Sequence, residues 1–375
     1  MTTTQLTEIY KIADTIDTFA LGHYARVVSA YDRRSHKNVA FKVMRPEHLT
    51  ADGEMKWEFK AFYNEADLLQ RLSASPSVIR LLDCGYLESA HEVPEGGEIA
   101  SFGTKVKEFT AAAQGYSEQG WRPYLALEEL PRTHNLLYVM KPNQPGTRWR
   151  LPTEEGIALA MQFAQFMQVA HSNKVVYLDH KLEHVYWDGA RLQVIDLNSS
   201  RLLNGAANDN QQFRTDIHNF CVGILYPLFT GISAVTGGLR ATPSSMAEVE
   251  VRYKDVMTLD FGVEPSLSPA VQEVIQRGAS MEYENVGDFL GQLYYAASLH
   301  GWDTPHLDND PARRQARDNM RQGLKRLRQG QEAIREARDI LRDTLTIDDI
   351  TPDQEEELRR LAKAVNTMIN ARVIP

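Results

Sequence analysis

The chain has 375 residues, of which 43% are hydrophobic and 24% are charged, and its formal net charge is −9. This composition is typical of a globular protein large enough for more than one domain, and the negative charge argues against a surface that binds nucleic acids. The cysteines, Cys84 and Cys221, are too far apart for a zinc motif, so buried reduced thiols are expected. The polar first ten residues lack a signal core and the apolar run at 224–229 is too short to span a membrane, which predicts a cytoplasmic protein.

The first part of the chain has strand patterns. Residues 19–32 and 38–44 are rich in apolar strand formers, and a polar cluster at 33–37 separates them, which predicts an antiparallel meander. Lys42 lies within the apolar segment Val39-Ala40-Phe41-Lys42. An unpaired ammonium group is costly in a core, so Lys42 either lies on an edge strand or has a partner.

A helix is predicted over residues 54–73, because five apolar side chains recur there at helical spacing. These are Phe59, Phe62, Ala66, Leu69 and Leu72. Glu65 lies at the edge of this apolar face, where it either faces solvent or pairs with Lys42.

Further strands are predicted at 78–86 and 123–130. Between them, residues 88–120 contain several glycines and an alanine triplet with little periodicity, which predicts a long insertion with room for a short helix. A helix with acidic residues in its first turn is predicted after Pro152.

The most informative stretch is 175–198, which reads as strand, loop, strand, turn, strand and turn. Asp179 and Asp196 each follow a short apolar run. A carboxylate in such a place is costly in a core and useful in a functional site. Lys181 and His184 lie close by in the sequence.

Taken in order, these features resemble the protein kinase family. Asp179 and Lys181 match the catalytic loop H-R-D-x-K-x-x-x-N, Asp196 matches the aspartate of D-F-G, and residues 39–42 match V-A-I-K. The resemblance covers about residues 12–300. It implies an α+β, two-lobed kinase-like fold, with a small β-rich N-lobe at 1–130, which carries the insertion at about 88–120, and a larger helical C-lobe at 131–300.

The resemblance also implies the roles of individual residues. Mg-ATP would bind between the lobes, where Lys42 holds the α- and β-phosphates and pairs with Glu65. Asp179 would accept the proton of the acceptor hydroxyl, Lys181 would neutralise the γ-phosphate and Asp196 would bind Mg²⁺. His184 takes the place of the second metal ligand, and Asp216 that of the aspartate that braces the catalytic loop. The other positions implied to line the nucleotide pocket are Gly22, Val27, Ala40, Leu127, Glu128, Leu130 and Tyr186.

Several family residues are replaced. Gly22 is the one glycine left of the three in the nucleotide loop, and Tyr177 and Leu178 replace the histidine and arginine before the catalytic aspartate. His184 replaces an asparagine, and imidazole suits softer metals better than Mg²⁺. The segment that leads from Asp196 to the next helix is short and has no Ala-Pro-Glu signature, which indicates that the peptide-docking platform is lost.

Three functions therefore remain open. The first is a divergent serine/threonine protein-kinase-like phosphotransferase that acts on itself or on another protein. The second is a pseudokinase, which would sense nucleotide or serve as a scaffold for an unknown protein partner. The third is a small-molecule kinase, which would not need the peptide platform, although the loop lacks the H-G-D form of such relatives.

The composition changes from residue 308 onward. Residues 312–342 contain ten Lys and Arg against four Asp and Glu, with a near-heptad apolar stripe. A second helix is predicted after Thr351, with acidic residues in its first turns. The two helices of 308–375 are expected to form an antiparallel hairpin that packs on itself, on the kinase-like body, or in a homodimer through residues 312–370.

Overall fold

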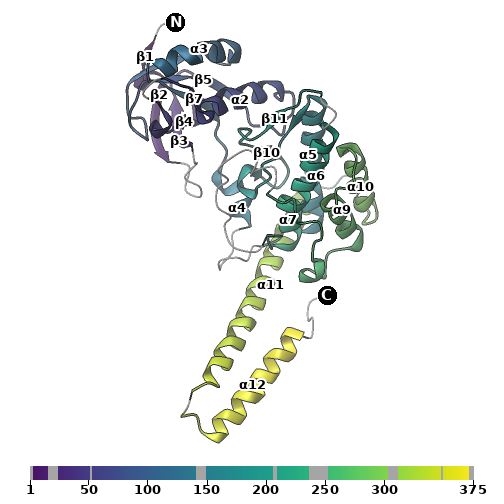
Figure 1. Ribbon diagram of the computed structural model, residues 1–375. Helices are drawn as coiled ribbons and strands as arrows, with labels where there is room; N and C mark the ends of the chain where they lie inside the picture. Colours follow the sequence, from purple (N-terminus) through teal and green to yellow (C-terminus); the bar gives the residue numbers. More distant parts are fainter. Residues whose placement is uncertain are drawn as a thin grey trace.

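The computed structural model describes residues 3–15, 24–50, 53–140, 149–205, 209–235, 252–302, 311–347 and 349–370. The protein is a mixed α+β molecule in which an antiparallel sheet forms the N-terminal part and helices form most of the C-terminal part (Figure 1). Within the described residues, no helix is long and apolar enough to cross a membrane.

The N-terminal sheet has seven strands, and each strand pairs with its neighbours in antiparallel register. In spatial order they are β1 (Thr4–Gln5), β6 (Glu98–Ser101), β5 (Leu81–Leu87), β7 (Arg122–Glu128), β4 (Lys37–Met44), β3 (Ala25–Asp32) and β2 (Tyr10–Thr15). The strands predicted near 38–44, 78–86 and 123–130 are confirmed. The predicted strand 19–32 is confirmed from Ala25, while Gly22 lies outside the described residues.

The sheet has an apolar core on each face, because successive residues of a strand point to opposite sides. Leu125 and Leu127 of β7 pack with α2 (Trp57–Arg71) on one face. Tyr124 and Ala126 pack on the other face. The predicted helix at 54–73 is confirmed as α2, and its five apolar side chains are all buried.

The region 88–120 contains the helix for which the predicted insertion left room, and in addition a strand of the sheet that was not predicted. It contains β6, which joins the sheet beside β5, and the helix α3 (Val106–Glu118), which packs against α2. Phe109 and Tyr116 of α3 both stack on Tyr86 of β5, with ring centroids 4.9 and 4.4 Å apart. Aromatic packing across elements therefore orders a region that has little apolar periodicity of its own.

The C-terminal part is helical. Its main helices are α5 (Thr153–Ser172), α6 (Asp209–Phe220), a π-helical turn (Cys221–Leu225), α7 (Tyr226–Thr230), α9 (Pro269–Ala279) and α10 (Val286–Ser298). The helix predicted after Pro152 is confirmed as α5. Phe163 of α5 stacks on Phe220 of α6 with ring centroids 4.3 Å apart, and both cysteines are buried and free, as predicted.

Short elements connect the sheet to these helices and carry the central stretch. They are α4 (Leu136–Val139), the pair β8 (Val175–Val176) and β11 (Arg201–Leu202), and the pair β9 (Val185–Trp187) and β10 (Leu192–Val194). A further short helix, α1 (Leu6–Ile9), joins β1 to β2 within the sheet. The predicted order of strands, loop and turns in 175–198 is confirmed.

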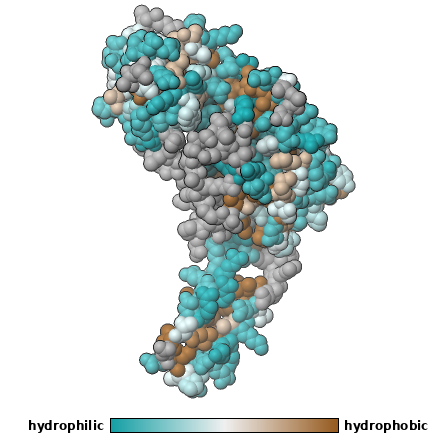
Figure 2. Space-filling model, viewed as in Figure 1, coloured by the Kyte–Doolittle hydropathy of each residue, from teal (hydrophilic) through white to brown (hydrophobic). Residues whose placement is uncertain are grey.

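The tail forms a helical hairpin of α11 (Pro311–Thr344) and α12 (Pro352–Asn370), which lie side by side and extend away from the body (Figure 1). The first half of α11 docks on the body, where Arg321 pairs with Glu155 and Arg328 pairs with Glu264. Packing on itself and on the body are thus both confirmed. No described side chain of 311–370 is fully buried, and apolar side chains show on the hairpin surface (Figure 2). The homodimer stays a prediction.

Candidate functional site

Lys42 of β4 forms ion pairs with both α2 and the central stretch 175–198. Its Nζ lies 2.7 Å from Oε2 of Glu65 on α2 and 3.0 Å from Oδ1 of Asp196. Because β4 lies between β3 and β7, the lysine is on an interior strand rather than on an edge. Burial alone would lower the pKa of Lys42, but Asp196 and Glu65 outweigh it and raise this pKa well above its ordinary value. The expected Lys42–Glu65 pair is present, and the ammonium group stays charged.

Tyr24, which directly precedes β3, covers this ion pair. Lys42 Nζ lies 5.4 Å from the centroid of the Tyr24 ring, a distance suited to a cation–π contact. Asn198 donates a hydrogen bond from Nδ2 to the Tyr24 hydroxyl. Asn198 therefore ties the loop after Asp196 to the segment that leads into β3.

Asp216 of α6 holds the backbone of the predicted catalytic segment. Its fully buried carboxylate accepts hydrogen bonds from the N–H groups of Tyr177, at 3.0 Å, and Leu178, at 2.8 Å. His171 Nε2 lies 2.9 Å from the same carboxylate. Burial alone would raise the pKa of Asp216, but His180, His171 and the Leu178 N–H group outweigh it and hold this pKa below its ordinary value. The predicted brace beneath the loop is present.

The backbone is strained at two places in the central stretch. Leu178 and Asp196 have φ angles of 66° and 60°, in the left-handed region that costs energy for residues other than glycine. Such strain persists only where the surrounding structure imposes it, and it is concentrated at functional sites. Here it falls directly before Asp179 and at Asp196, the two aspartates singled out by the sequence.

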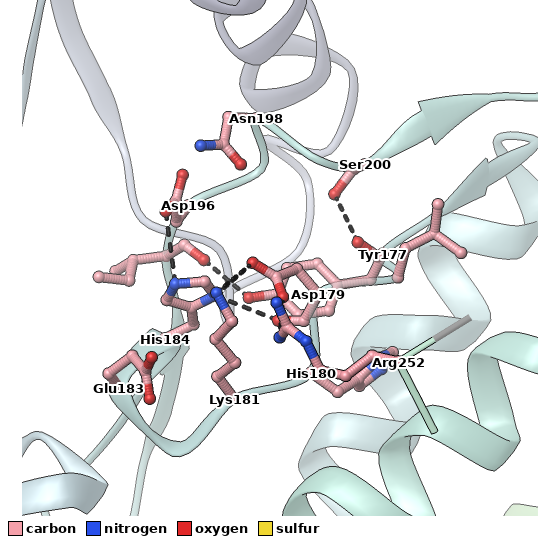
Figure 3. A network of polar contacts seen from close by, with 12 residues as sticks. Tyr177, Asp179, His180, Lys181, Glu183, His184, Asp196, Asn198, Ser200 and Arg252 are labelled. Carbon is pink, nitrogen blue, oxygen red and sulfur yellow. Dashed lines mark hydrogen bonds and ion pairs between the residues drawn. The ribbon is translucent and has the colours of Figure 1, made fainter. Parts of the chain in front are cut away.

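Asp179 lies beside two cationic side chains (Figure 3). Lys181 Nζ is 2.9 Å from its Oδ2, and Nη1 of Arg252 is 2.5 Å from its Oδ1. Burial alone would raise the pKa of Asp179, but His184, Lys181 and Arg252 hold it below its ordinary value. Asp179 is therefore ionised, and with 4% of its surface exposed it has little contact with solvent.

His184 lies between the two aspartates (Figure 3). Its Nδ1 is 3.1 Å from the Asp179 carbonyl oxygen, and its Nε2 is 3.4 Å from Oδ2 of Asp196. A carbonyl oxygen can only accept a hydrogen bond, so Nδ1 carries the proton and the Nε2 lone pair faces a carboxylate. Two electron-rich groups that face one another are stabilised by a positive charge between them, either a proton or a metal ion.

Asp196 and His184 are too few to hold a metal ion by themselves, but they could complete the shell of a metal ion that is also bound by phosphate. Across the described ranges, no three His, Cys, Asp or Glu side chains lie close enough together to hold a metal ion. Mg²⁺ bound with a nucleotide, however, needs only one or two carboxylates, because phosphates and water complete its shell. Asp196 and His184 offer one carboxylate and one imidazole, and the imidazole favours metals softer than Mg²⁺.

The sheet brings Lys42 and three of the other implied nucleotide-pocket residues to one face. Val27 is the cross-strand partner of Lys42, and Ala40 is the partner of Leu127. Since Ala40 and Lys42 are two residues apart on β4, all four side chains point to the same side. Of this group, Val27 and Ala40 are half-buried and Leu127 is buried.

The remaining implied pocket residues are not all brought to that face. Glu128 points elsewhere, since its carboxylate pairs with Arg80, with Nε and Oε2 3.0 Å apart, and its N–H donates to the Arg80 carbonyl. Leu130 is half-buried against the main core, and Tyr186 is half-buried on β9, where its backbone bridges to Asn135.

Sequence reasoning missed two residues of this site, Tyr24 and Arg252. Tyr24 was expected as an ordinary strand residue, and no motif marks Arg252, which follows a stretch that reads as a loop. An ion pair between residues 73 positions apart leaves no local pattern in the sequence.

No protein-family model matches this chain, and a comparison with curated proteins finds no similar sequence. The resemblance to kinases therefore rests on the residues and contacts described above. Function has to be inferred from the chemistry that those residues can perform.

Proposed function

We propose that the chain is a divergent protein-kinase-like phosphotransferase, with the sheet as its N-lobe, the helices as its C-lobe and Mg-ATP as phosphoryl donor. The observation that carries the proposal is the placement of Lys42 between Glu65 and Asp196. A buried ion pair adds little net stability, because its desolvation offsets its Coulomb energy. A charged lysine held beside a carboxylate that can bind a metal is, in contrast, the arrangement needed to hold a nucleotide's phosphates.

The residues around Asp179 supply the rest of the inventory. Phosphoryl transfer depends chiefly on positioning and on charge neutralisation. The acceptor oxygen forms a bond to the γ-phosphorus while the bond from that phosphorus to the β–γ bridging oxygen breaks, and ADP leaves. Asp179, which is ionised, accepts the hydroxyl proton, and Lys181 offsets the charge of the transferred group. A divalent metal held by Asp196 and His184 would neutralise phosphate charge.

A thermal melt tests nucleotide binding. The wild type, with ATP and Mg²⁺ at about a hundredfold the dissociation constant, should gain about 2.7 kcal/mol of stability. Asp196→Ala should lose this gain, because it removes the carboxylate that pairs with Lys42 and serves the metal. Asp67→Ala, which removes an exposed carboxylate of α2, is the matched control and should keep the gain. A wild type that shows no shift with Mg-ATP would refute the proposal.

The second candidate is a pseudokinase that binds nucleotide without transferring phosphate. It is favoured by Arg252, which pairs with the would-be base and leaves Asp179 4% exposed. Transfer of radiolabel from ATP separates the two candidates. Labelling of the wild type that is lost in Asp179→Asn supports the enzyme, whereas a wild type that binds Mg-ATP and acquires no more label than Asp179→Asn does supports the pseudokinase.

A further inference from the structure

Arg252 and Lys181 together engage both oxygens of the Asp179 carboxylate. Arg252 Nη1 lies 2.5 Å from Oδ1, while Lys181 Nζ lies 2.9 Å from Oδ2, so each carboxylate oxygen already has a cationic partner. The side chains of Arg252 and Asp179 are 7% and 5% exposed. A hydroxyl that is to lose its proton must come within hydrogen-bond distance of the same carboxylate. In the arrangement observed here, the arginine occupies one of the two oxygens that could accept that proton.

The backbone beside Arg252 is anchored, whereas its side chain has the length to move. The Tyr253 hydroxyl donates to the carbonyl oxygen of His180, at 2.9 Å, and the Tyr253 carbonyl lies 3.0 Å from His218 Nε2. Gly223 allows this contact, since a Cβ there would lie 2.5 Å from the His180 oxygen and 2.8 Å from the Tyr253 ring. Release of Asp179 by a change of the Arg252 side-chain rotamer would therefore leave the neighbouring backbone attached to the segment that carries Asp179.

We propose that Arg252 selects an anionic acceptor: it pairs with Asp179 in the absence of acceptor and transfers to a phosphate or carboxylate that lies beside the acceptor hydroxyl. This inference rests on the proposed phosphotransferase function and adds the chemical class of its acceptor. The exchange leaves Asp179 free to take the hydroxyl proton.

The charge balance favours an anion over a neutral acceptor. Removing one partner of a buried ion pair without replacement is strongly destabilising, so a neutral acceptor would bind at the cost of the Arg252–Asp179 pair. An anionic acceptor restores a charge pair for the guanidinium at the same place. The planar fork of arginine matches the oxygens of a phosphate or carboxylate, which makes the exchange specific.

The test uses hydrolysis of ATP in the full chain, with water as the neutral acceptor and with Mg-ATP binding checked first by thermal melts. Arg252→Gln removes the charge, Arg252→Lys keeps it, and Arg214→Gln, which disrupts an exposed pair with Glu284, is the control. Methyl phosphate and acetate are titrated as small anions at constant ionic strength, which separates a phosphate from a carboxylate preference.

We expect slow hydrolysis by the wild type, Arg252→Lys and Arg214→Gln, and hydrolysis at least tenfold faster by Arg252→Gln. At least one anion should accelerate the wild type severalfold and leave Arg252→Gln unchanged. An Arg252→Gln variant that binds Mg-ATP but hydrolyses it no faster than the wild type overturns the inference. So does a wild type that neither anion accelerates. Failure of the wild type to bind Mg-ATP is a different result, since it refutes the proposed function itself and the acceptor selection with it.

Discussion

Asp216→Asn tests the brace beneath the catalytic segment. The substitution keeps the size of the side chain but replaces one oxygen by an NH₂ group. Oδ1 accepts from Leu178 N–H at 2.8 Å, and Oδ2 accepts from Tyr177 N–H at 3.0 Å, so either orientation of the amide sets its NH₂ group against a backbone donor. Leaving a buried donor without an acceptor costs about 1–3 kcal/mol, and hydrogen bonds to a charged group are worth more than neutral ones. We expect the variant to be destabilised by about 3 kcal/mol.

Melting curves and amide exchange measure this effect. A loss of about 3 kcal/mol corresponds to a melting temperature lower by about 6–12 °C, since 1 kcal/mol shifts a domain of this order of size by about 2–4 °C. Exchange at the amides of Tyr177 and Leu178 should accelerate, because they lose their acceptor. Glu284→Gln, an exposed carboxylate near α10, is the control and should change stability by less than about 0.5 kcal/mol. A variant that melts within 2 °C of the wild type, by the same estimate, and keeps both amides protected would show that Asp216 does not brace the segment.

The remaining predictions concern charge, metal and the tail. Burial would raise the pKa of Asp196, but Lys42 and His184 lower it to about 2, so the stability that its ionised carboxylate contributes is present above about pH 4 and is lost as the pH falls toward 2. The melting temperature of Asp196→Asn should therefore depend less on pH between about pH 4 and about pH 2 than that of the wild type. The same pH dependence in both proteins would count against the Lys42–Asp196 pair. If the His184 imidazole is a metal ligand, Mn²⁺-ATP should raise the melting temperature more than Mg²⁺-ATP does, because imidazole binds softer metals than Mg²⁺ better. His184→Asn should lose this preference. The same preference in the wild type and the variant would rule out ligation by His184. Arg321→Ala removes the arginine partner of the Glu155 carboxylate, whose side chain is 1% exposed, and should lower the free energy of unfolding by about 1–3 kcal/mol, with faster amide exchange in α11. Unchanged exchange would mean that this ion pair does not dock the tail.

Much of the fold could be predicted from the sequence because local periodicity encodes it. The five apolar positions of α2 recur at helical spacing, and all five are buried against the sheet. The Lys42–Glu65 ion pair could also be predicted, because a lysine inside an apolar strand is costly to bury without a partner of opposite charge. A glutamate at the edge of an apolar helix face is placed to be that partner. Asp179 and Asp196 could be identified as candidate site residues because each carboxylate follows a short apolar run.

The region 88–120 shows where local reasoning ends. It lacks apolar periodicity, yet β6 pairs with β5, and α3 is held by the stacking of Phe109 and Tyr116 on Tyr86. Its order depends on surfaces that other parts of the chain supply. A pattern within the segment could not predict this, because the packing energy arises from contacts across elements.

The sequence by itself determined the central strands β4, β5 and β7, the helices α2 and α5, the helical hairpin, and the identity of the charged residues Lys42, Glu65, Asp179 and Asp196. Only the tertiary structure decided which charges meet and how far Asp179 is exposed. Arg252 pairs with Asp179 although 73 positions separate them, and Tyr24 covers Lys42 from the segment that leads into β3. Chain folding brings such groups together at distances where electrostatic interactions in a buried site are strong, and this proximity is a property of the packed molecule rather than of any local pattern.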